Sequence, residues 1–77
     1  MQDGRERPLS GVPSGASVVL RRIRAGRELE ARLTAMGFVA GERVTVCRNE
    51  VHGPLVVSVK GSRVMLGRGM AEQVAVG

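Results

Sequence analysis

The apolar pattern in the middle of the chain predicts a short amphipathic helix that stops at a glycine before a β-strand. Leu29, Leu33 and Met36 recur at the spacing of one helical face, and charged residues fill most positions between them. Gly37 follows where a left-handed cap is needed. We therefore expect a helix of about three turns, from Arg27 to Met36, with one apolar stripe against the core.

Alternating apolar residues predict two strands after this helix. A tight turn at Gly41 leads into the first strand, Arg43 to Arg48, and a longer loop, 49–54, joins it to the second, Leu55 to Lys60. The valines expected to face the interior are Val44, Val46, Val57 and Val59. This pattern is typical of an antiparallel hairpin with one buried face.

Three further strands complete the expected sheet. The earliest, Ala16 to Ile23, loses its alternation near Arg21-Arg22, which predicts a β-bulge that bends it. Gly61 is expected to turn the chain, with positive φ, into a strand from Arg63 to Leu66. A helical turn and a last strand are expected at Gly67 to Ala71 and Gln73 to Val76. About five short strands with one early helix favour a mainly β fold, a small bent barrel.

Length and composition predict one domain with a thin core. At 77 residues the chain suits a single domain, expected over 9–77 after a flexible N-terminus, 1–8. Hydrophobic residues make up 43% of the chain, but Phe38 is the single aromatic residue. Aliphatic side chains must therefore supply the packing, and three methionines are expected to fill gaps in the core: Met36, Met65 and Met70.

The single cysteine and the N-terminal residues favour a cytoplasmic protein. One cysteine excludes an internal disulfide, so a reducing compartment is the simplest inference. The first ten residues lack the apolar stretch of a secretion signal. No apolar run approaches the length of a membrane-spanning helix.

Basic residues form the most prominent candidate binding feature. The net charge is +5, and four arginines cluster within seven residues: Arg21, Arg22, Arg24 and Arg27. No neighbouring acid balances them before Glu28. Because arginine pairs bidentately with carboxylate or phosphate, we expect this cluster to contact an anionic partner.

The sequence predicts neither a catalytic site nor a metal site. No phosphate-binding loop, nucleophile with an oriented base, or evident pair of carboxylates is present, so no enzyme is expected. Cys47, Glu50 and His52 are the local metal-ligating types, and they are too few for a complete coordination shell in one chain. A metal bridging two chains is left open.

The order of elements resembles the FeoA family, ferrous iron transport protein A, whose members are small SH3-like barrels with a helix after the first strand. Arg32-Leu33 with Met36-Gly37-Phe38 is similar to the family's R-L-x-x-L-G-L motif. Further on, the residues that resemble its turn and strand patterns are Gly41, Val44 and Val46, then Gly53-Pro54-Leu55, Val57, Val59, Gly61, Arg63 and Leu66. Ala40 stands where the family usually has proline before the turn glycine.

This resemblance implies a cytoplasmic accessory protein of bacterial ferrous iron uptake. Its implied partner is the FeoB permease, bound through the permease's GTP-binding region, so that the membrane is reached only indirectly. It implies no cofactor, and the oligomeric state stays open.

Two alternatives remain at this point. A nucleic-acid-binding small barrel would use the same positive charge, but it normally adds exposed aromatics for base stacking. An isolated SH3-like module of a metal-dependent transcriptional repressor resembles the family closely. Such repressors place a DNA-binding half ahead of the module, and only eight residues precede the barrel pattern here, so we expect a free-standing protein.

Overall fold

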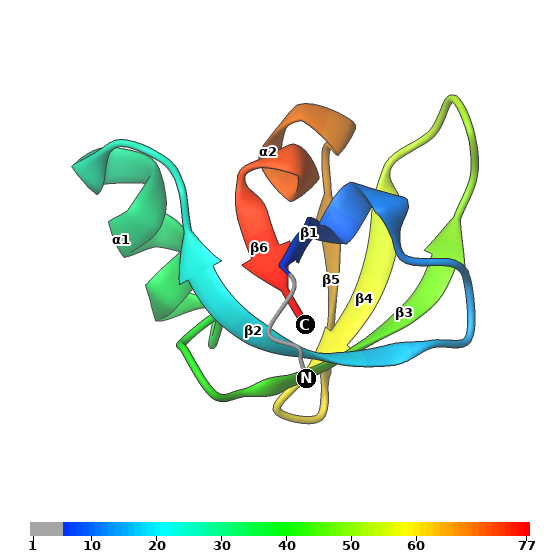
Figure 1. Cartoon of the computed structure of the whole chain (residues 1–77), viewed down its shortest axis with the longest axis horizontal. Helices are drawn as coiled ribbons and strands as arrows, with labels where there is room; N and C mark the ends of the chain where they lie inside the picture. The colour runs from blue at the N-terminus through cyan, green and yellow to red at the C-terminus, as the bar shows by residue number, and fades with distance from the viewer. Residues whose placement is uncertain (1–5) are drawn as a thin grey trace.

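Six antiparallel strands form one strongly curved sheet in the computed structural model, which describes residues 6–77 (Figure 1). Their order across the sheet is β1-β6-β2-β3-β4-β5. The strands are β1 (Arg7–Pro8), β2 (Ser17–Ile23), β3 (Arg43–Asn49), β4 (Leu55–Val59), β5 (Ser62–Leu66) and β6 (Val74–Val76). Two α-helices, α1 (Arg27–Ala35) and α2 (Arg68–Glu72), and one 3-10 helix, η1 (Leu9–Gly11), complete the described chain. The fold is therefore mainly β, as predicted, with element ends that shift by a residue or so.

The first strand was not expected, because the sequence assigns Arg7 and Pro8 to a flexible N-terminus. In the structure Arg7 pairs with Val76 and Pro8 with Ala75. Proline lacks an amide hydrogen, and an edge strand such as β1 tolerates it because one side of that strand needs no ladder partner. Of the rest of the expected flexible segment, Glu6 is described and directly precedes β1, and residues 1–5 lie outside the described residues.

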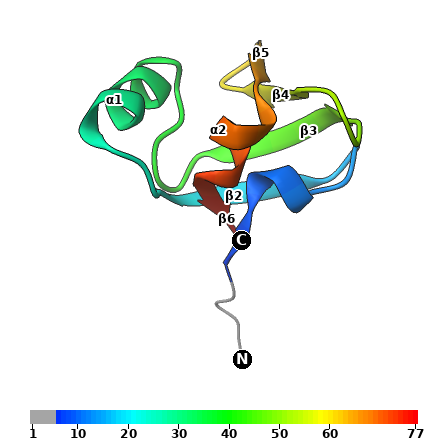
Figure 2. The ribbon, with the colours of Figure 1, turned by 90° about the horizontal axis from the view of Figure 1, so that it is seen from above.

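The predicted bulge in β2 is present. The register between β2 and β6 shifts between Leu20 and Arg22, which pair with Val76 and Ala75 respectively. An extra residue on one strand bends it and increases its twist. The bend lets β2 pair with β3 near its start and with β6 near its end, so that the sheet curls around the core (Figure 2).

Aliphatic side chains from every strand except β1 fill the interior. The predicted inward valines, Val44, Val46, Val57 and Val59, are all buried. They form one cluster with residues from the helices and loops, among them Leu9, Leu33, Phe38 and Leu66. No buried polar or charged residue lies among the described residues. Burial of apolar surface therefore holds this small sheet together.

Helix α1 ends in a hydrogen-bonded glycine cap. The amide of Phe38 donates to the carbonyl of Leu33 and that of Gly37 to the carbonyl of Thr34, both at 3.0 Å. This is the Schellman arrangement, in which the residue after the glycine contacts the helix residue five positions before it. Leu33 and Phe38 are both fully buried and belong to the same cluster. The cap therefore directs Phe38 into the core.

Two of the three methionines expected in the core are exposed instead. Met36 caps the helix after its last turn and is 40% exposed, so the predicted apolar stripe is reduced to Leu29 and Leu33. Met65 is 68% exposed, because alternation along β5 sends its neighbour Leu66 inward. Met70 packs partly buried against the core. The fully buried side chains are therefore those of valine, leucine, alanine and Phe38.

Helix α1 stands to one side of the sheet, attached by few side chains (Figures 1 and 2). Leu33 is its one fully buried residue, and Leu29 is partly buried against the same core. The helix exposes most of its surface, including Ala31 and Ala35.

Two residues with positive φ close the β4–β5 hairpin. Val59 pairs with Ser62, so Lys60 and Gly61 form a two-residue turn with φ angles of 52° and 78°. Positive φ at both positions is the geometry that suits the twist of the flanking strands. Gly37 and Gly41 also adopt positive φ, at 105° and 91°.

We predict that Gly61→Ala destabilises the protein by about 1–2 kcal/mol, because a side chain is strained in the left-handed region. A Cβ at position 61 would meet nothing within 4 Å, so strain alone should produce the effect. Gly69→Ala is the matched control. Its Cβ would also meet nothing, but it lies in α2 without positive φ, so stability should stay equal or rise. Chemical denaturation checks both, and equal midpoints for the two variants would contradict the assignment.

Candidate functional site

The arginine cluster lies at the end of β2 and along its connection to α1. Arg21 and Arg22 belong to the bulged part of β2, Arg24 follows the strand, and Arg27 begins α1. All four are exposed. The cluster is therefore open to solvent, at the end of β2 that pairs with β6.

The structure corrects the expectation that no nearby acid balances these arginines. Arg22 donates from Nε and Nη2 to Oε2 of Glu6, at 3.2 and 2.9 Å. Arg24 donates from Nη2 to Oε1 of the same carboxylate, at 3.3 Å. One carboxylate thus bridges two guanidinium groups. The side chain of Glu6 is 21% exposed, whereas those of Arg22 and Arg24 are 62% and 64% exposed.

The sequence offers little signal for this pairing. Glu6 precedes Arg22 by 16 residues, and the sheet brings the two together because β6 lies between β1 and β2. The relation between residues 6 and 22 therefore depends on a third strand, far away in the sequence.

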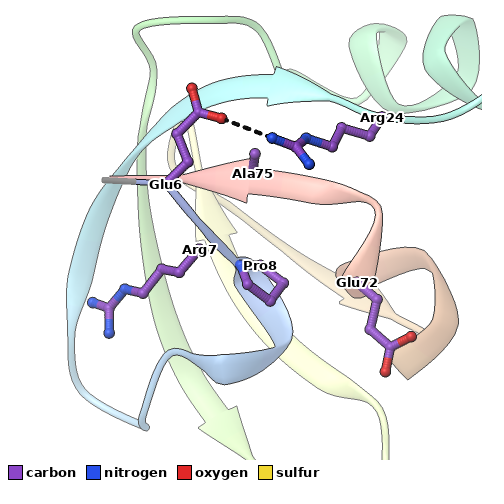
Figure 3. Close-up of a pocket in the computed structure, with 6 residues that line it drawn as sticks. All are labelled: Glu6, Arg7, Pro8, Arg24, Glu72 and Ala75. Atoms are coloured by element: carbon purple, nitrogen blue, oxygen red, sulfur yellow. Dashed lines mark hydrogen bonds and ion pairs between the residues drawn. The ribbon is translucent and has the colours of Figure 1, made fainter. Parts of the chain in front are cut away.

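A shallow pocket of about 250 Å³ opens beside this bridge (Figure 3). Pro8 and Ala75 contribute its apolar part, and Glu6 with Arg24 forms one side. Arg7 and Glu72 reach outward on other sides of the pocket. Its small size and mixed lining suit a side chain of a partner better than a free cofactor.

The other two arginines of the cluster lie apart from this bridge. Arg21 packs beside Gly77 and lines a groove between β2 and α1, whereas Arg27 lines a shallow depression on α1. Neither forms an ion pair with another residue in 6–77. The cluster therefore divides into a bridged pair, Arg22 and Arg24, and two separate cations.

The metal-ligating residue types are not gathered into a site. Cys47 and His52 are exposed, and the carboxylate of Glu50 lies 3.9 Å from Arg48. Across residues 6–77, no three His, Cys, Asp or Glu side chains lie close enough to hold an ion. A complete shell needs more ligands than these.

We predict that the dilute monomer binds neither ferrous iron nor zinc tightly. Exposed Cys47 and His52 offer too few ligands for either metal. Calorimetric titration under anaerobic, reducing conditions should give no saturable heat. Sub-micromolar binding that His52→Ala abolishes would overturn this expectation.

Sequence reasoning also missed a polar network centred on Arg68 and Asn49. Arg68 donates from Nη2 to Oδ1 of Asn49 at 2.6 Å and also to the carbonyl of Glu50. The Asn49 amide donates to the carbonyls of Ser10 and Val12, at 3.0 and 2.7 Å. These bonds fix the β3–β4 loop against η1 and α2. At the tip of that loop, Val51 is 77% exposed.

The described part of the chain contains no helix of the length and apolar character needed to span a membrane.

Comparison with known proteins places these features in a family. The sequence model of the FeoA domain matches residues 7–77. A protein of Methanocaldococcus jannaschii, provisionally named Fe(2+) transport protein A, is 38% identical over 69 residues that cover 90% of this chain and 83% of that protein.

Solved structures agree with this match. The crystal structure of an iron uptake regulatory protein, FeoA, has a TM-score of 0.87 at 30% identity, and the match covers 94% of this chain and 96% of that one. The zinc complex of Stenotrophomonas maltophilia FeoA, described as a prokaryotic SH3 domain protein, has a TM-score of 0.81 at 32% identity, with 91% and 88% covered. The curved sheet is accordingly SH3-like, and the chain belongs to the FeoA family.

Proposed function

We propose that this protein is a cytoplasmic accessory factor of ferrous iron uptake that acts by binding the FeoB permease through its GTP-binding region. Membership of the FeoA family and the transport names of its relatives support the iron-uptake role. Metal-ligating side chains are scattered over the described residues, which favours a role in binding another protein over a role in carrying iron. The shallow pocket and exposed cations favour protein recognition over catalysis.

One observation carries the interaction part of this proposal. The four arginines lie exposed on a short stretch from the end of β2 to the start of α1, and the whole chain has a net charge of +5. Such a patch attracts an acidic partner, accelerates association and selects among partners. Arg22 pairs with Ala75 of β6, and the amide of Arg24 donates to the carbonyl of Gln73 at 2.6 Å, so the backbone of these two arginines is held against the end of the chain.

A nucleic-acid partner fits the surface less well. Single-strand binding at small barrels relies on exposed aromatics on which bases stack. Phe38 is the one aromatic residue, and it is fully buried. Backbone-only contact with duplex DNA, as in the repressor-module alternative, would use the charge alone and should weaken steeply with salt.

The proposal is tested by measuring the binding of the full chain to the purified GTP-binding region of the permease from the same organism. Duplex DNA and single-stranded RNA are titrated beside it at the same ionic strength. We expect saturable binding to the permease region and none to either nucleic acid. Saturable binding to DNA alone would favour a repressor-like role instead.

A further inference from the structure

We infer that Arg22 and Arg24 form a carboxylate-binding site which the protein's own Glu6 occupies, and that the partner docks by displacing Glu6 with an acidic side chain of its own. This inference rests on the proposed function, because it specifies the chemistry by which the arginine cluster engages its partner.

The occupied geometry defines the ligand. Nε and Nη2 of Arg22 form an edge that can bind a carboxylate bidentately, and here both donors converge on Oε2 of Glu6. Arg24 takes the other oxygen, Oε1. A planar group with two oxygens therefore fits the space between the two guanidiniums, and an aspartate or glutamate of a partner presents the same group.

Displacement is favoured over simultaneous binding. A second carboxylate on the remaining donors of Arg22 and Arg24 would lie close to Glu6, and two negative charges that share one site repel each other. With Glu6 gone, the pair offers both guanidinium groups to the incoming carboxylate. The adjacent pocket, with Pro8 and Ala75, can accept the aliphatic part of the partner's side chain.

Glu6 is placed so that it can leave at small cost to the fold. It directly precedes β1, whose ladder pairs begin at Arg7 and Val76, so its departure breaks no backbone pairing of the sheet. Arg22 and Arg24 are 62% and 64% exposed, and ion pairs of this kind are worth little in water. An intermolecular carboxylate with further contacts can therefore compete with it.

The test compares Glu6→Gln with the wild type. Gln keeps the shape of the side chain but removes the charge that holds the two arginines. The probes are a labelled hexaglutamate peptide, the permease's GTP-binding region, and duplex DNA. Freeing the site should tighten binding of the first two by about two- to five-fold, since the site is no longer shared with an internal competitor of modest strength.

Glu50→Gln is the matched control. It changes the net charge by the same amount, but Glu50 lies in the β3–β4 loop. Its carboxylate is exposed there and pairs only weakly with Arg48, at 3.9 Å. Its affinities should stay near wild type. Salt dependence gives a second readout. In the wild type, binding exchanges one carboxylate for another and leaves the number of ion pairs unchanged. In Glu6→Gln, binding adds ion pairs, so its affinity should depend on salt more steeply.

Each result decides. Unchanged or weaker hexaglutamate binding by Glu6→Gln would show that Glu6 only orients the arginines, and would overturn the inference. Tightening for DNA without tightening for hexaglutamate would also overturn it, in favour of a phosphate site. If hexaglutamate binding tightens but no form binds the permease region, the carboxylate site stands and the proposed partner fails. If wild type and Glu6→Gln bind the permease region equally, the partner stands and the displacement fails.

Discussion

Replacing Leu33 with alanine should lower the free energy of unfolding by about 2–4 kcal/mol. Leu33 is fully buried and is the one such residue in α1. Its carbonyl also accepts the capping bond from Phe38, whose ring lies in the same core cluster. Truncation would leave a cavity at the contact that attaches the helix. In a domain of this size the melting temperature should fall by about 10 °C or more.

Met36→Ala is the matched control, because the periodicity of the sequence places Met36 on the same face as Leu33. Met36 is 40% exposed, so its truncation should cost about 1 kcal/mol or less. Thermal melts followed by circular dichroism compare the two variants. A Leu33→Ala protein that melts within a degree or two of wild type would reject the role of this residue as the anchor of α1.

Most of the fold could be predicted from local sequence patterns. Alternation in β3 and β4 determines which valines face inward, and the glycine stop of α1 identifies the cap, because both signals depend on residues a few positions apart. The same rule accounts for the error at Met65. Leu66 faces inward on β5, so strict alternation already requires Met65 to face outward. Composition suggested a core methionine where the period of the strand excluded one.

The missed elements depend on contacts between distant parts of the chain. Arg7 and Pro8 carry no strand signal of their own, and they form β1 because β6 offers a free edge. Met36 fails as a core residue because the helix ends at Ala35 and the cap redirects the chain, giving its inward place to Phe38. At Met36, unlike at β1, the cause is local: the glycine cap ends the helical period one residue too early for Met36 to face inward.

The candidate site, like the fold, could be predicted from the sequence only in part. Four clustered arginines are visible in the sequence, so the basic surface was predicted. The polar partners were not, since Glu6 reaches Arg22 across β6 and Arg68 reaches from α2 to Asn49 at the end of β3. Polar side chains lack a period, and their pairing follows only after the strand order is known.

Reversing both bridged arginines, Arg22→Glu with Arg24→Glu, should weaken binding to the permease's GTP-binding region by at least about tenfold. The double variant removes two donors for a partner carboxylate and adds two like charges, and close charge pairs at interfaces contribute about 1.5 kcal/mol or more each. Association should slow more than dissociation quickens, and the salt dependence of the rate should flatten.

The fold should survive this change, because both side chains are more than 60% exposed and the reversal removes chiefly their exposed ion pairs with Glu6. Arg48→Glu with Arg63→Glu is the matched control. Arg48 lies exposed at the end of β3 opposite Val56, and Arg63 lies exposed on β5 opposite Ser58, so both are away from the cluster and their reversal changes the net charge equally. If both double variants slow association to the same degree, overall charge and not the bridged pair governs docking. If neither does while both melt normally, the docking surface lies elsewhere, and the exposed tip of the β3–β4 loop at Val51 becomes the surface to mutate next.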